Sequence, residues 1–372
     1  MNGTSRYLIY GIFFIIVFAA SSAFFGGILG PEDQVITPHI NPVAQNSSLL
    51  EVNHSFPFEG ATVEISVPIN NSVYQGARQA DQDITVYGNV SESVLLADSY
   101  RAMINDPSQD DFYRDLTGEL DTIRVEKGLS DDEFLELMAV YVQSLQYEAD
   151  ADIPAKYPIE TVMDGSGNCE DKSLLLAGLL SHEGYKVALF SFGPEDHMAL
   201  GVGSESYLYK NTGYAFVETT IYSYVGVPTK ILAGGVVLQS DPIVISIGNG
   251  TKVYTSGNET SFLEDTVALT EKRAEEMAPQ MNATSLSLET QQARINSLEA
   301  EMTSMRSRGN TPGYNSLVST HNAMVTDYNA ELASYRQNLV QYQNNVMIHN
   351  YIVSNVFDRP EVYQYVKQNP VT

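Results

Sequence analysis

The sequence predicts an α+β domain that lies between an N-terminal membrane-spanning helix and a long antiparallel coiled-coil hairpin. Three observations support this order. Residues 7–29 form an uncharged, largely apolar run. Between residues 130 and 257, a helical pattern is followed by short strand-like runs at hairpin spacing, which is typical of an α+β domain and not of a parallel sheet with crossover helices. Beyond residue 258, apolar and aromatic residues recur at three- and four-residue spacing, as in a coiled coil.

The apolar run of residues 7–29 has about the ~20 residues that a helix needs to cross a bilayer. Arg6 precedes it and Glu32 and Asp33 follow it, so the positive-inside bias places the amino terminus in the cytoplasm. We therefore expect a signal anchor that binds the lipid bilayer, in a single-pass protein of the cell membrane. A cleaved signal peptide is the alternative, with small residues at 21–23 for a peptidase. Both alternatives make the bulk of the chain extracytoplasmic.

The next segment, residues 51–129, is predicted to be β-rich and then helical. β-Branched runs at 61–67 and 83–87 alternate with polar residues, as in half-buried strands. A helical pattern then takes over and is interrupted at Pro107 and Gly128.

Two helix starts are marked inside the predicted domain. Ser130 and Glu133 form a capping box ahead of an apolar pattern, so we expect a helix from about residue 131. The turn at 165–168 supplies a cap for a second helix that begins at Cys169. Four strand-like runs and a closing β-rich piece follow: 186–192, 197–202, 207–210, 214–219 and 234–254.

The last third of the chain is predicted to be the hairpin. Residues 264–306 read as one long helix, and 308–313 contain the Gly and Pro residues of a turn. Each arm would be roughly 50 to 65 Å long at about 1.5 Å per residue. We interpret the aromatic stripe of the second arm as the packing seam and the hairpin as a stalk, or as an arm for self-association or a partner protein. The stripe recurs every seven residues: Tyr314, His321, Tyr328, Tyr335 and Tyr342.

Composition restricts the classes of function. The 372 residues carry 20 Lys and Arg against 46 Asp and Glu, a formal net charge of −26. Nucleic-acid binding depends on basic residues that neutralise phosphates, so we expect no nucleic-acid partner. Cys169 is the single cysteine, which excludes an intrachain disulfide and a cysteine-based zinc site. Acidic clusters at 106–111 and 130–133 lack the spacing of a calcium-binding loop, and we expect no metal and no cofactor.

Cys169 is the candidate nucleophile. The amino-terminal end of a helix favours a thiolate, but Glu170 and Asp171 oppose this, so a neighbouring imidazolium is needed. His197 begins a predicted strand and can supply it, while Glu218, at the end of another, can hold the imidazole in one tautomer. The alternative is that Cys169 is a small buried hydrophobe. The Gly-Ser-Gly-Asn turn before it favours the catalytic interpretation.

Three stretches of the chain together resemble the transglutaminase-like superfamily. The resemblance covers about residues 130–232 and implies a papain-like core, in which the helix that bears the cysteine packs on an antiparallel sheet. It also implies that Cys169 is the nucleophile, His197 the general base and then acid, and Glu218 the orienting acid in place of the family's Asp. Asp171 matches the acid of the family's helix-start motif. The stretches are Gly167-Asn-Cys-Glu-Asp with the helix after it, Asp196-His-Met-Ala-Leu-Gly201, and Phe216-Val-Glu-Thr-Thr220.

Two further stretches, 140–147 and 157–162, resemble the lead-in of membrane-linked prokaryotic members of this superfamily. The resemblance implies thiol acyl transfer on amide bonds of a protein or peptide substrate: a cysteine peptidase or amidase with water as acceptor, a cross-linker with an amine. The backbone N–H of Cys169 would bind the oxyanion, with a second donor for which Asn168 is a candidate. The alternative function is a non-catalytic cell-surface binding or assembly module, with a relaxed triad and a coiled-coil interaction arm.

These patterns divide the chain into six parts. They are a transmembrane signal anchor (1–30), a linker rich in Pro, Asn and Ser (31–50), a β-rich and then helical lead-in (51–129), the transglutaminase-like domain (130–257), the coiled-coil hairpin (258–350) and a C-terminal tail (351–372).

Overall fold

The computed structural model describes residues 34–45, 48–82, 85–87, 91–149, 154–228 and 237–371. The chain divides into two compact units: Met1–Ser261 with Val356–Arg359, and Phe262–Asn355 with Pro360–Thr372. The predicted anchor at 7–29 lies outside the described residues. Within the described ranges, no helix is both long enough and apolar enough to cross a bilayer.

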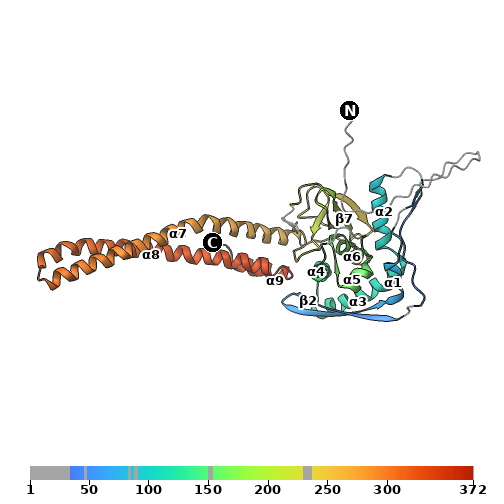
Figure 1. The fold of residues 1–372 in the computed structure, drawn as a ribbon, viewed down its shortest axis with the longest axis horizontal. Coiled ribbons are helices and arrows are strands. Elements are labelled where there is room, and N and C mark those ends of the chain that lie inside the picture. Colours follow the sequence, from blue (N-terminus) through green and yellow to red (C-terminus); the bar gives the residue numbers. More distant parts are fainter. Residues whose placement is uncertain are drawn as a thin grey trace, which may run out of the picture. The chain divides into compact units, whose positions relative to one another are not determined.

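The first unit combines helices with an antiparallel sheet, so the predicted α+β class is confirmed (Figure 1). The sheet has the strand order β10-β7-β8-β9, and each neighbouring pair is antiparallel. Its strands are β7 (Val187–Phe192), β8 (His197–Gly203), β9 (Tyr214–Val217) and β10 (Ile243–Ile247).

Three strand predictions need correction. No strand forms at 207–210, because Tyr207 and Lys210 have φ angles of +54° and +45°, which a β-ladder does not accommodate. The strand predicted for 214–219 ends at Val217, since the next carboxylate bonds to its own turn instead of leaving the backbone free for the ladder. Of the β-rich piece at 234–254, the described residues form the strand β10 and two isolated β-bridges, at Lys252 and Tyr254.

The helix α6 (Cys169–His182) packs against β7 and β8 on one side and against other helices elsewhere. Its neighbours include α4 (Asp131–Ser144), α5 (Pro158–Asp164) and β7 (Figure 1). Residues 174–180 are all buried, because a helix that is apolar on every face is stable only in the middle of a core. This burial fixes the position of Cys169 at its first turn.

The predicted helix start near residue 131 is confirmed. The N–H of Glu133 donates to Ser130 Oγ (3.3 Å), and the N–H of Ser130 donates to Glu133 Oε2 (2.7 Å). The helix α1 is absent from the prediction; Asn70 caps it by accepting from the N–H of Ser72 at 3.0 Å. The remaining helices of the unit are α1 (Asn71–Arg78), α2 (Glu92–Ile104), η1 (Pro107–Gln109), α3 (Asp110–Lys127), α4 (Asp131–Ser144), α5 (Pro158–Asp164) and η2 (Gly193–Glu195).

A two-stranded ribbon lies against α3 and α4. It pairs β2 (Leu49–Phe58) with β3 (Ala61–Asn70), and alternate apolar residues of β3 are buried. The period of two arises because successive strand side chains point to opposite faces. Two shorter pairs complete the sheets: β1 (Gln34–Ile36) with β4 (Thr85–Tyr87), and β5 (Gln146–Tyr147) with β6 (Ser166–Gly167).

The segment Val356–Arg359 belongs to the first unit and is held by a buried ion pair. Arg359 Nε donates to Glu136 Oε1 at 2.5 Å, and Tyr254 Oη donates to the same oxygen at 2.7 Å. Glu136 and Arg359 are 8% and 6% exposed. Arg359 lies in the segment 351–372, for which a C-terminal tail is predicted, and begins the helix α9 (Arg359–Gln368) there.

The second unit contains two long helices that pack together as an antiparallel hairpin (Figure 1). The pairs Gln291–Glu331 and Glu299–His321 show that the two helices run in opposite directions. Tyr328, Tyr335 and Tyr342 are half-buried, in agreement with a packing seam. The helices are α7 (Gly257–Ser307), α8 (Thr311–Ser354) and α9 (Arg359–Gln368), the last within the predicted tail.

Candidate functional site

Cys169 is the first residue of α6, and a reciprocal cap fixes the turn that precedes it. The N–H of Asp171 donates to Asn168 Oδ1 (2.9 Å), and the N–H of Asn168 donates to Asp171 Oδ2 (3.0 Å). The other oxygen of Asp171 accepts from the N–H of Lys156 at 2.7 Å. Asp171 therefore serves the backbone of this turn. The side-chain oxygen of Asn168 accepts in the cap, so the side-chain group of this residue that could donate to an oxyanion is the amide nitrogen Nδ2.

Gly167 is required by this packing. A Cβ at that position would lie 2.7 Å from the Cβ of Asp171, too close for any side chain. The Gly-x-Cys-x-Asp spacing thus has a local steric reason: the glycine lets the capping carboxylate fold back over the turn.

The structure brings His197 and Glu218 together. His197 begins β8 and Glu218 directly follows β9. His197 is 8% exposed and Glu218 is 0% exposed. The distance from His197 Nε2 to Glu218 Oε2 is 3.6 Å, an ion-pair distance slightly longer than a direct hydrogen bond. Because Nε2 faces the carboxylate, the other ring nitrogen is the one available to Cys169.

One oxygen of Glu218 is fixed by its own turn. Oε1 accepts from the N–H groups of Thr219 and Thr220 at 3.0 and 2.9 Å, and from Thr220 Oγ1 at 2.6 Å. Oε2 remains directed at His197. The side chain of Glu, one methylene longer than that of Asp, folds back far enough to satisfy both sets of contacts.

The charges of the site favour a protonated imidazole. Burial alone would lower the pKa of His197, but its polar interactions with Cys169 and Glu218, and the negative charges of these groups, raise the pKa to about 9. At neutral pH His197 is then an imidazolium, and a neighbouring imidazolium stabilises a thiolate. Cys169 is a free cysteine, and the residue as a whole is only partly buried.

Three residues that the sequence reasoning missed surround this group. Burial raises the pKa of Tyr147, and the charges of Cys169 and Glu218 add to the effect, so the phenol lies near both. Gln143 Nε2 donates to the backbone oxygen of Glu218 at 2.8 Å. The third is Lys172, buried one turn beyond Cys169. For Gln143 and Lys172, the sequence offered one signal, which is a polar residue at an otherwise apolar helix position.

Glu170 lies next to the nucleophile and is partly buried. Burial raises its pKa to about 7, while a hydrogen bond from Tyr100 acts in the opposite direction and the charges of Asp171 and Asp196 add to the increase. The carboxyl group is therefore partly protonated at neutral pH, so it opposes a thiolate at Cys169 less than the sequence suggests.

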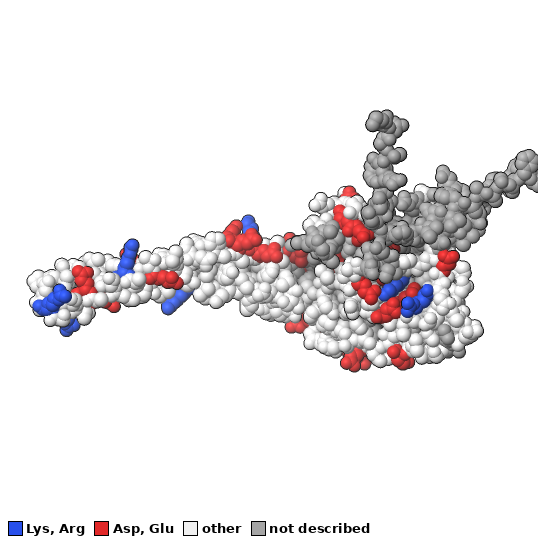
Figure 2. Space-filling view, in the orientation of Figure 1, with Lys and Arg blue, Asp and Glu red and all other residues white. Residues whose placement is uncertain are grey.

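The described residues contain no group of three or more His, Cys, Asp and Glu side chains that could hold a metal ion. On the face shown in Figure 2, basic side chains are interspersed with acidic ones over the described surface.

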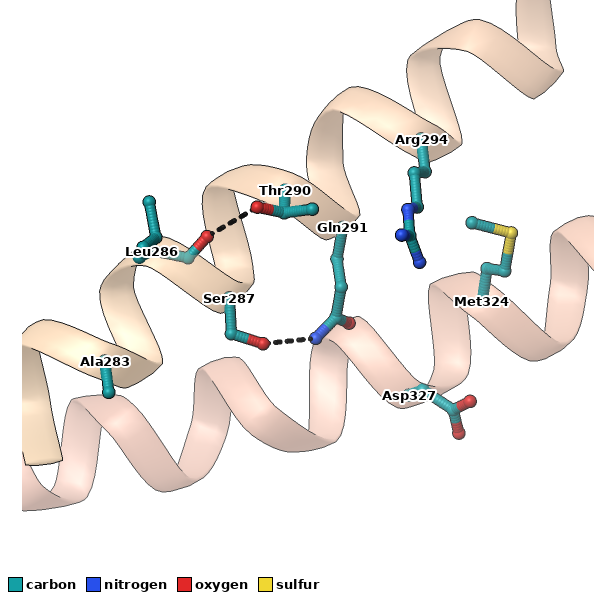
Figure 3. A pocket seen from close by; sticks show the side chains of 8 residues that line it. All are labelled: Ala283, Leu286, Ser287, Thr290, Gln291, Arg294, Met324 and Asp327. Atoms are coloured by element: carbon teal, nitrogen blue, oxygen red, sulfur yellow. Dashed lines mark hydrogen bonds between the residues drawn. The ribbon is translucent and has the colours of Figure 1, made fainter.

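A separate hollow of about 660 Å³ lies between α7 and α8 in the second unit (Figure 3). Arg294 and Met324 extend into the space between the helices, and Asp327 points away from it. Leu286 on its rim is 66% exposed. The lining contains no pair of nucleophile and base, so the hollow is not a candidate catalytic site.

The chain matches no protein-family model, no curated protein and no solved structure. Cys169, His197 and Glu218 are therefore the features of this chain that bear most directly on its function.

Proposed function

We propose that the protein is a thiol acyl transferase that acts on amide bonds of a protein or peptide, with a transglutaminase/papain-like core. The single observation that carries this proposal is the position of His197. Its imidazole is buried, its pKa is raised by interactions with Cys169 and Glu218, and its Nε2 lies 3.6 Å from Glu218 Oε2. A thiol at a helix start, a base and an orienting acid are the three groups that nucleophilic catalysis by cysteine requires.

The acylation step uses the charged pair. The thiolate of Cys169 attacks the amide carbonyl carbon, and a carbon–sulfur bond forms. His197 gives its proton to the leaving nitrogen as the carbon–nitrogen bond breaks, which leaves a thioester and a neutral imidazole. The backbone N–H of Cys169, at the amino-terminal end of α6, is directed at the developing oxyanion.

The second step regenerates the enzyme. The neutral imidazole of His197 takes a proton from water or from an acceptor amine as that molecule attacks the thioester carbonyl. The carbon–sulfur bond then breaks, and the thiolate and imidazolium are restored. Glu218 holds the ring orientation and stabilises its positive charge throughout. Water as acceptor gives hydrolysis, and an amine gives cross-linking.

In this proposal the apolar run of residues 7–29 tethers the protein to the cell membrane, with the first unit on the extracytoplasmic side. The net charge of −26 supports a cationic or neutral substrate over an anionic one. The hairpin serves as a spacer or as a surface for self-association or a partner protein.

An activated ester tests the proposal without knowledge of the natural substrate. The full-length protein, in detergent, is mixed with p-nitrophenyl acetate, and nitrophenolate release is followed together with the mass of the protein. We expect acetylation of Cys169 to be faster than acetylation of free glutathione at the same pH. Cys169→Ala is expected to abolish this reaction, and His197→Ala to slow it by about 10²- to 10⁴-fold.

Acetylation of Cys169 at the rate of glutathione, unchanged in His197→Ala, would contradict the proposal. It would favour the non-catalytic module instead. In that case, deletion of residues 264–347 is expected to abolish binding or assembly, whereas Cys169→Ala leaves both unchanged.

A further inference from the structure

Lys172 is a buried lysine directly beneath the candidate site. It lies in α6 one turn beyond Cys169, and its exposed fraction is 0%. Lysine is rarely buried without a partner, because its charge must leave water. In a helix that otherwise continues with leucines, an apolar residue would fill this position more simply. The presence of an ammonium group here therefore needs an explanation.

The end of α4 provides one set of partners. Lys172 Nζ donates to the backbone oxygens of Gln143 and Leu145, at 3.2 and 2.9 Å. These carbonyls belong to the last turn and the C-cap of α4. Carbonyls at a helix end lack partners within the helix and carry the negative end of its dipole, so they favour a cation.

The side chain of Gln143 extends this network to the triad acid. Its Nε2 donates to the backbone oxygen of Glu218 at 2.8 Å and to that of Ser223 at 3.1 Å, and its Oε1 accepts from the N–H of Ser223 at 3.4 Å. Gln143 is 4% exposed. One buried residue thus binds Lys172 through its backbone and both ends of the Glu218 turn through its side chain.

Lys172 also interacts with the charge of Glu218. Burial lowers the pKa of Lys172 to about 8, and the charge of Glu218 opposes this effect. At neutral pH the amine is therefore mostly protonated. The ammonium of Lys172 therefore supplies a positive charge that interacts with the carboxylate of Glu218, which also faces His197.

We infer that Lys172 is a positioning residue for the thiol chemistry, which keeps Glu218 ionised and oriented toward His197 through its charge and through Gln143. This inference rests on the proposed function. Without the ammonium group, the fully buried carboxylate would lose its compensating charge and hold the imidazolium less strongly, so Cys169 would form a thiolate less readily.

The test is the pH midpoint of iodoacetamide labelling of Cys169 in the full-length protein, with thermal unfolding measured in parallel. Lys172→Met keeps the length of the side chain and removes its charge. We expect the midpoint to rise by about one pH unit, a tenfold loss of thiolate at a given pH. The matched control is Lys156→Met, since Lys156 pairs with Glu148 and Asp164 and not with Glu218. Its midpoint is expected to equal that of the wild type.

A double-mutant cycle separates positioning from a general structural role. In a Glu218→Gln background the carboxylate is absent, so Lys172→Met is expected to cause no further rise in the midpoint. An equal rise in both backgrounds, or a folded Lys172→Met with the wild-type midpoint, would overturn the inference. If Lys172→Met does not fold, Gln143→Met interrupts the same network without removing a charge. It is expected to raise the midpoint, and a wild-type midpoint in that folded variant would likewise overturn the inference.

The two proposals fail in different ways. If the wild-type midpoint is that of a free thiol and does not change in His197→Ala, the proposed function fails. If the midpoint is low and depends on His197 but is unaffected by Lys172→Met, only the role of Lys172 fails.

Discussion

His197 and Glu218 meet because the start of β8 and the end of β9 lie at the same end of two adjacent antiparallel strands. His197 is the first residue of β8, and Glu218 directly follows β9. The register pairs Leu200 with Val217, so each step back along β8 corresponds to a step forward past β9. The distance from His197 Nε2 to Glu218 Oε2 is 3.6 Å, so one residue from β8 and one that follows β9 come together. The geometry of this pair therefore depends on strand register.

The carboxylate of Glu218 is expected to be necessary for the reactivity of Cys169. Glu218→Gln retains an acceptor for the bonds from Thr219 and Thr220 but removes the negative charge that faces His197. We expect acetylation by p-nitrophenyl acetate to slow by about 10²- to 10⁴-fold. Glu218→Asp is the conservative comparison and is expected to retain more activity than Glu218→Gln. An unchanged rate in both variants would contradict an orienting role.

The stability of the fold should depend on pH through His197. Its pKa is about 9 in the folded chain against 6.5 for an ordinary histidine, so the folded state holds the proton more tightly. This contribution, about 2 to 3 kcal/mol, is present in full below pH 6.5 and is lost as the pH rises through 9. Urea unfolding between these pH values measures it. His197→Gln should show a flatter dependence, and an identical slope in both proteins would exclude the raised pKa.

Glu170 is expected to cause a second pH dependence of the stability of the fold, at lower pH than that of His197. Its pKa is raised from 4.5 to about 7 by burial, so the folded state binds the proton more tightly than the unfolded chain. The stabilisation is present in full below pH 4.5 and is lost as the pH rises through 7, about 1 to 2 kcal/mol for a partly buried group. Glu170→Gln should remove this dependence from urea unfolding. Glu126→Gln, at an exposed position, is the control and should retain it.

The ion pair between Arg359 and Glu136 is expected to hold the segment Val356–Arg359 in the first unit. Arg359→Met leaves the carboxylate of Glu136 buried without its cation, which should cost about 3 to 5 kcal/mol of unfolding free energy. The double variant Arg359→Met, Glu136→Gln removes both charges and should recover part of this loss, as measured by urea unfolding. A double variant as unstable as the sum of the two single variants would show that the ion pair contributes nothing specific.

The parts of the fold that follow from local chemistry could be predicted from the sequence. The helices that begin at residues 131 and 169 each depend on a capping box whose two residues lie within four positions of each other in the sequence. Both capping boxes form. The turn at 207–210 could not be distinguished from a strand, because aromatic residues favour strands while the positive φ angles are imposed by the surrounding fold.

The supporting residues of the candidate site depend on long-range contacts instead. Gln143 and Glu218 are 75 positions apart in the chain, and no local pattern pairs them. Lys172 reads in sequence as an interruption of an apolar helix, and its role becomes visible only where the end of α4 approaches it. The buried partner of Glu136 lies 223 positions away, in the segment for which a C-terminal tail is predicted.

The most direct test of the central claim is the pH dependence of iodoacetamide labelling of Cys169 in the full-length wild type and in His197→Ala. A thiol paired with an imidazolium should label with a midpoint well below ~8.5, the pKa of a free thiol, and the midpoint should rise in the variant. A midpoint at or above ~8.5 that is the same in both proteins would show that Cys169 and His197 do not form a reactive pair, and would contradict the account of this site.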